Sequence, residues 1–289
     1  MAFGLAVLAA FAAVLCWGIG DFMIQRNVRK VGDNEALLFI GAIGGVMLLP
    51  FAWNDIPALL EMQNLLLIGA LGIMTFAAAM LDFEALKQGK LSVIEVILEI
   101  ELPITIILGL VFFHESLSVE TLAAIGFIFL GIVLMAVKSH HIKNIPRLLE
   151  RGVIWGVLGA ICMGAVNFLT AASARQISPI MAVWGPYVIF SMMCLVLLWK
   201  SNGFGKIAVD WKKFRGPIIA MGIVDTLAWV FYAIATANGE IAAITAITEC
   251  YPAIGLFLGI QINKEHVELH QILGGAIALV AGIALAFAL

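Results

Sequence analysis

Ten long apolar stretches, separated by short polar connections, make up most of the chain. Each has about 20 residues, the length that an α-helix needs to cross the hydrocarbon core of a bilayer. Strand-like alternation is not sustained anywhere, and an open sheet edge cannot face lipid. We therefore predict an all-α membrane protein with ten transmembrane helices, at residues 3–25, 34–52, 65–86, 91–113, 119–137, 152–174, 179–199, 217–237, 241–262 and 267–287.

The composition excludes several other classes of protein. Hydrophobic residues make up 63% of the chain and charged residues 12%, about half the charged share of a soluble domain. The net charge of −3 and the lack of a basic stripe argue against a nucleic-acid partner. The four cysteines lie within apolar stretches and predict no disulfide framework. His266 and His270 lack the residue order of a zinc motif, so we expect no metal and no cofactor.

Basic residues are almost confined to alternate connections. Fifteen of the sixteen Lys and Arg residues follow odd-numbered predicted helices, and Arg175 alone follows an even-numbered one. Because cytoplasmic loops carry the excess of Lys and Arg, both termini are predicted to lie outside the cytoplasm, in a protein of the cell membrane (inner or plasma membrane). Trp53, Trp199 and Trp211, at or beyond the span ends, are expected to be interfacial anchors.

Acidic residues, in contrast, occur inside the apolar stretches. A charge at mid-bilayer costs about 3 kcal/mol, so intramembrane carboxylates are functional candidates by default. No Lys or Arg lies within the stretches, so we expect protons, metal ions or a cationic substrate to balance the charge. The eight residues are Asp21, Asp82, Glu84, Glu95, Glu99, Glu101, Asp225 and Glu249.

The chain divides into two similar halves. Residues 16–22 and 162–168 share Cys, Gly and Phe in register, which aligns Asp21 with Asn167. Five helices per half force the second half to insert upside down, as in the inverted repeats of secondary transporters. The predicted domains are a first repeat at residues 1–138, a basic linker at 139–151 and a second repeat at 152–289.

Short motifs recur in corresponding places of the halves. They are Trp17-Gly18, Phe83-Glu84-Ala85-Leu86, Pro103 and His114-Glu115, then Phe231-Tyr232-Ala233-Ile234, Tyr251-Pro252 and Lys264-Glu265. At these residues the chain resembles the drug/metabolite transporter superfamily, specifically its ten-helix branch of two EamA-like domains. The resemblance covers essentially the whole chain and implies export or exchange of small metabolites, often amino acids, through a central cavity. Members commonly keep their termini in the cytoplasm, and their fourth helix is usually less acidic.

Two prolines lie close to acidic residues in the predicted spans. Pro103 and Pro252 disfavour helix one turn back and are expected to free the carbonyls of Glu99 and Thr248. Such a break survives in lipid only if it is buried in protein or lines water. We interpret both prolines as hinges; the alternative is a kink that only fits neighbouring helices together.

Four glutamates are candidates for proton or ion coupling. Glu95 and Glu99 share one helix face, whereas Glu101 lies about 200° around from Glu99, so protein or water is expected on both sides. A buried carboxyl group binds and releases protons closer to neutral pH than one in water. Glu249 is the counterpart of Glu99 in the second half. Glu95 has a second interpretation, as a solvated residue at the mouth.

The remaining polar and aromatic residues supply candidate substrate contacts. Aromatic faces attract cations, although core packing is the alternative. The candidates are Asp21, Asn167, Asp225, Trp17, Trp184, Tyr187, Trp229, Tyr232 and Tyr251. Asp82 and Glu84 stand near a span end and are assigned to the mouth, with an interfacial salt bridge as the alternative.

These features predict a secondary active transporter, not an enzyme. Its partners would be the lipid bilayer, protons and a small cationic or zwitterionic metabolite, such as an amino acid or amine. Alternating access and proton-coupled antiport are the expected mechanism, in a monomer or a homodimer. The alternatives are a cation or metal-ion channel or carrier and, less in keeping with the sequence, a membrane-embedded enzyme.

Overall fold

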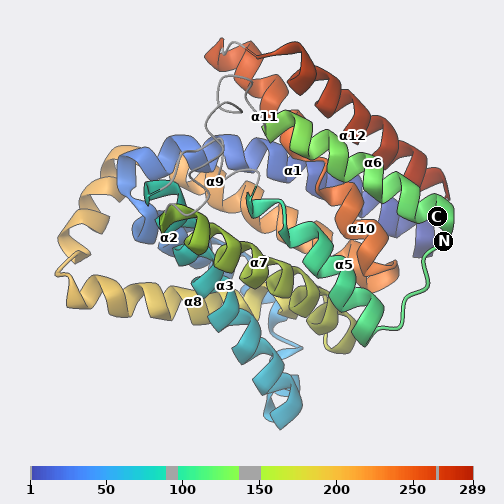
Figure 1. Ribbon diagram of the computed structural model, residues 1–289. Coiled ribbons are helices and arrows are strands. Elements are labelled where there is room, and N and C mark those ends of the chain that lie inside the picture. The colour runs from blue at the N-terminus through green and yellow to red at the C-terminus, as the bar shows by residue number, and fades with distance from the viewer. Residues whose placement is uncertain (1, 89–96, 137–150, 265–266, 289) are drawn as a thin grey trace.

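The computed structural model describes residues 2–88, 97–136, 151–264 and 267–288, which form helices joined by short turns and contain no strand (Figure 1). The helices are α1 (Ala2–Val31), α2 (Asp33–Ala52), η1 (Ile56–Leu60), α3 (Met62–Gln88), α5 (Glu101–Phe112), α6 (Val119–Ala136), α7 (Arg151–Gln176), α8 (Met181–Lys200), α9 (Phe204–Asn238), α10 (Ile241–Thr248), α11 (Pro252–Leu258), η3 (Gly259–Asn263) and α12 (Leu269–Ala288).

Nine segments in the described part of the chain are long and apolar enough to cross a membrane. Each overlaps one of the ten predicted spans. The remaining predicted span, residues 91–113, lies partly outside the described residues, and its described part contains α5, a helix of 12 residues. Large apolar side chains such as Val46 (75% exposed) and Phe287 (89% exposed) point outward, as expected for a surface that faces lipid.

Most of the polar connection predicted between residues 199 and 217 is helical. α9 begins at Phe204 and runs for 35 residues, with a kink at Phe214 (φ −125°, ψ 18°). The kink puts Pro217 in the first turn of the following segment, where its missing N–H costs little. α1 likewise continues to Val31, past the predicted end at residue 25.

One close helix pair joins the last helix of each half. α6 and α12 lie side by side at one edge of the molecule (Figure 1). A Cβ atom at Gly131 would lie 2.6 Å from the carbonyl oxygen of Gly274, and one at Gly274 would lie 2.5 Å from the carbonyl oxygen of Gly131. The two backbones are therefore in direct contact, which only glycine permits at these positions.

Two large hydrophobic clusters form the core. One joins α1 to α5, α6, α10 and α12, and the other joins α1 to α2, α8 and α9. Trp229 of α9 packs against both, and also against a smaller cluster between α3 and α7. This residue therefore marks the centre of the molecule, where the helices of both halves meet.

Candidate functional site

Both predicted helix interruptions are present in the structure. A turn at Glu249–Tyr251 separates α10 from α11, which begins at Pro252, and residues 99–100 form a turn just before α5. The carbonyls expected to be free are not: that of Glu99 accepts a hydrogen bond from the Leu102 amide (3.3 Å), and that of Thr248 accepts one from the Tyr251 amide (3.1 Å). Tight turns thus replace the lost helical bonds, so the prediction that these two carbonyls are free is wrong.

Four of the six candidate aromatic residues come together beside the second turn. The Trp17 ring lies 5.1 Å from Trp229, 5.4 Å from Tyr232 and 6.0 Å from Tyr251, measured between ring centroids. The Tyr232 hydroxyl lies 2.8 Å from the Thr245 hydroxyl and donates to the backbone carbonyl of Asn167 at 3.3 Å. This aromatic cluster connects α1, α7, α9 and α10, and so joins the two halves.

A second group pairs the mid-span carboxylate with a tyrosine. The Tyr187 hydroxyl donates to Oδ2 of Asp225 at 2.8 Å, and both residues are buried. Gly44 of α2 packs against the Tyr187 ring, where a Cβ atom would overlap it. Trp184, one turn before Tyr187, instead donates its indole N–H to the carbonyl of Gly45 at 3.0 Å. Trp184 therefore belongs to the α2–α8 contact and not to the aromatic cluster.

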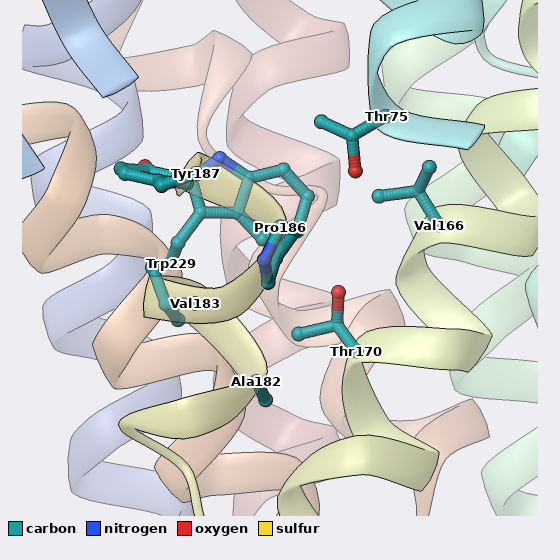
Figure 2. A pocket seen from close by; sticks show the side chains of 8 residues that line it. All are labelled: Thr75, Val166, Thr170, Ala182, Val183, Pro186, Tyr187 and Trp229. Carbon is teal, nitrogen blue, oxygen red and sulfur yellow. The ribbon is translucent and has the colours of Figure 1, made fainter. Parts of the chain in front are cut away.

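Tyr187 and Trp229 share a small pocket of about 10 Å³. Figure 2 shows the hydroxyls of Thr75 and Thr170 turned toward the same space, opposite the Trp229 ring. The full lining is Thr75, Val166, Thr170, Ala182, Val183, Pro186, Tyr187 and Trp229. Sequence reasoning missed both threonines, because a threonine within a helix can bond its own preceding turn, as Thr75 does to the Leu71 carbonyl (2.8 Å).

The candidate coupling glutamates lie at the two turns. Glu249 is 3% exposed, whereas Glu99 and Glu101 are half-buried. The Tyr232 hydroxyl lies within electrostatic range of Glu249 and Glu101. Glu95 lies outside the described residues. Asp21 lies in α1, but its side chain is outside the described part of the structure.

The two candidate mouth residues of α3 have different surroundings. Glu84 lines a hollow of about 910 Å³, part of it open solvent, between the start of α2, the end of α3 and the start of α7. Its lining also includes Asp33, Glu35 and Trp155. Asp82 packs against Gly159 of α7, and its Oδ1 is buried without a hydrogen-bond partner among the described residues.

The opposite end of the molecule carries a network around Arg175, the last charged residue of α7. Its guanidinium donates to Oε1 of Glu115 (3.1 Å) and to the carbonyls of Thr236 (2.8 Å) and Gly239 (2.6 Å). The Glu115 carboxylate also accepts the amides of Ile241 (2.7 Å) and Ala242 (3.1 Å), the first two of α10. A carboxylate from the first half thus caps the broken helix of the second.

Within the described ranges, no group of three or more His, Cys, Asp or Glu side chains is arranged to hold a metal ion. The site is instead a set of buried hydroxyls, aromatic rings and carboxylates between apolar helices. Such a set can bind a small organic molecule and exchange protons.

The apolar helices and this buried polar pocket define an integral membrane protein. The sequence model of the EamA-like transporter family matches residues 4–137 and 150–288. The chain therefore belongs to this family, which makes it a membrane transporter of small molecules and agrees with the resemblance to the drug/metabolite transporters.

Comparison with solved structures supports the same fold. Twenty-eight chains match; one of them, titled "Crystal structure of protein", superposes with a TM-score of 0.78 at 15% sequence identity, covering 97% of this chain and 96% of its own. At that identity the likeness concerns the fold alone. A comparison with curated protein sequences gave no match.

Proposed function

We propose that this protein is a secondary active transporter that moves a small cationic or zwitterionic metabolite, such as an amino acid or amine, by alternating access. The observation that carries the proposal is the buried Asp225 carboxylate, held by Tyr187 at the edge of a pocket between the two halves. A substrate ammonium group would neutralise this carboxylate, and the Trp229 face would attract the same cation. No Lys or Arg lines the pocket, which disfavours phosphorylated substrates.

The architecture supports an exchange between two access states. We propose two five-helix repeats of opposite orientation, residues 1–138 and 152–289, joined by a linker at 139–151. Inverted repeats transport by rocking against each other around a site near the midplane. The pocket of about 10 Å³ has room for about one water molecule, far less than the 300–1,000 Å³ typical of ligand sites, so substrate entry requires its lining helices to separate.

Proton coupling is the second element of the proposal. Glu249 and Glu99 stand at the two helix turns, with Glu101 beside the latter, and Pro103 and Pro252 would act as hinges. Asp21, whose counterpart is Asn167, would join Asp225 in substrate contact. We also propose that the Lys-rich end faces the cytoplasm, which places both termini outside it.

Counterflow in proteoliposomes tests the transport assignment. We expect saturable, trans-stimulated uptake of a radiolabelled amino acid or amine, and loss of most uptake in Asp225→Asn. Asp210→Asn is the matched control, because Asp210 is a carboxylate on the same helix, equally buried at 7%, but it lies before the kink at Phe214, whereas Asp225 accepts the hydrogen bond of the pocket residue Tyr187. Unsaturable conductance would indicate a channel, and equal effects of the two variants would remove the role of Asp225.

A pH series of the same assay tests the coupling assignment separately. Glu99→Gln and Glu249→Gln are expected to flatten the pH dependence of uptake while leaving assembly intact. Glu84→Gln, in the hollow at the end of α3, serves as the control. If both turn variants keep the wild-type pH dependence, the coupling assignment is wrong, even where Asp225 remains essential.

A further inference from the structure

The first eleven residues of α9, before the kink at Phe214, form a separate feature that we call the basic arm (residues 204–214). Ile207 and Phe214 pack against the core cluster of α1, α2 and α8. The Trp211 ring lies 6.0 Å from Phe39 of α2, and Lys206 Nζ lies 2.8 Å from Oε1 of Glu35. The arm is therefore held against the bundle as a helix and is not a loose connection.

The outward side of the arm mixes cations with apolar side chains. Phe204 is 46% exposed, Val209 61% and Trp211 39%. The exposed cations on and next to the arm are Lys30, Lys200, Lys206, Lys212, Lys213 and Arg215. Mixed cationic and apolar exposure on a helix is typical of one that lies in the plane of a membrane interface.

These cations are largely available to an external anion. Lys206 is paired with Glu35, but no described carboxylate forms an ion pair with Lys200, Lys212, Lys213 or Arg215. Lys213 and Lys30 both approach the Phe214 ring, at 5.1 and 5.5 Å from its centroid. Cations from α1 and α9 therefore lie close together around the ring of Phe214.

We propose that the basic arm, with Lys30, Lys200 and Arg215, is a binding surface for the phosphate headgroups of anionic phospholipids. A lipid fits better than a free anion, since neither of the two pockets described above is lined by these cations. Trp199, 69% exposed beside Lys200, supplies a further interfacial ring. α9 then turns at the kink into its membrane span, which sets the arm at headgroup depth. This surface is independent of the proposed substrate pocket.

Lipid titration of the purified full chain in neutral detergent tests the proposal, with bound lipid resolved by native mass spectrometry. Wild-type protein is expected to bind phosphatidylglycerol in preference to phosphatidylcholine. Each cation near a membrane surface contributes about fivefold to binding, so K212Q/K213Q is expected to weaken phosphatidylglycerol binding by about 25-fold. K212R/K213R keeps the charge and should bind like the wild type.

The pair K200Q/R215Q provides a second, independent set and is expected to show a similar loss. Equal affinity of the wild type for the two lipids would overturn the proposal, as would wild-type phosphatidylglycerol binding by both Gln pairs. Competition by millimolar inorganic phosphate that removes the lipid preference would show a site for free phosphate instead. An unchanged melting temperature of the Gln variants in lipid-free detergent shows that any loss is not misfolding.

Discussion

The two ends of the bundle each carry an ion pair between segments far apart in the sequence, but the pairs are built differently. At one end, the side chains of Arg175 and Glu115 are 26% and 6% exposed. At the other, those of Lys206 and Glu35 are 50% and 12% exposed. Arg175 also binds two backbone carbonyls and lies 4.3 Å from the centroid of the Phe113 ring, whereas Lys206 has a single acceptor.

The Arg175–Glu115 pair is part of the packed structure, whereas the Lys206–Glu35 pair is a surface contact. At the Arg175 end, both partners of the ion pair also bond backbone groups at the end of α9 and the start of α10, so removing either one leaves buried polar atoms without partners. At the basic end, water can replace either partner of the Lys206–Glu35 pair. The start of α10 in the second half thus depends on Glu115 of the first half. The basic arm, in contrast, does not depend on its one exposed ion pair.

Among the variants of the two ion pairs, Arg175→Ala is expected to lower the free energy of unfolding most. The change leaves the nearly buried Glu115 charge uncompensated and two carbonyls without their donor, which costs about 2–3 kcal/mol. The free energy of unfolding in detergent measures the loss. A loss no greater than that of Lys206→Ala would show that the two pairs are equivalent.

Glu115→Gln is expected to cost less, about 1–2 kcal/mol. The glutamine keeps one oxygen for the α10 amides but loses the charge that attracts Arg175 and favours the helix N-terminus. The same unfolding measurement tests this, and amide hydrogen exchange at Ile241 and Ala242 should accelerate. Unchanged exchange at these two amides would contradict the capping role.

Lys206→Ala is expected to cost less than about 1 kcal/mol, as for other exposed ion pairs. Because salt screens exposed charges, the difference from the wild type should shrink further in 1 M NaCl. The Arg175→Ala difference should change little over the same range. A salt-insensitive loss at Lys206 would mean that its pair with Glu35 is shielded from solvent.

Glu240→Gln is expected to have the smallest effect, a slight gain in stability at neutral pH. Burial raises the pKa of Glu240, and the nearby Glu115 raises it further, against the opposing effect of Arg175. A raised carboxyl pKa means that the folded state favours the protonated form, so stability is lost as pH rises through the folded pKa. The gain in melting temperature should therefore disappear in acid, below the unfolded pKa of glutamate; a gain that persists there would contradict this cause.

The sequence predicted the positions of the apolar helices well, but it predicted the polar connections and the contacts of individual side chains less well. The apolar stretches located nine described helices, but the basic arm was read as a connection because its charges outweighed its helical spacing of Ile207, Trp211 and Phe214. Trp17, Trp229, Tyr232 and Tyr251 do meet, in the aromatic cluster. Trp184 was a candidate for the same reason, as an aromatic residue within a predicted span. It lies elsewhere, because its neighbours depend on how α2 and α8 pack.

The sequence alone determined which described segments are long and apolar enough to cross a membrane and which connections are basic. Both follow from the total hydrophobicity or charge of residues that are adjacent in the chain, because the transfer of a helix into lipid depends on its own side chains. Only the tertiary structure decided that Tyr187 binds Asp225, that the hydroxyls of Thr75 and Thr170 face one pocket, and that Glu115 caps α10. Such contacts join residues far apart in the chain, and their geometry is set by the packing of helices against one another, which no local pattern records.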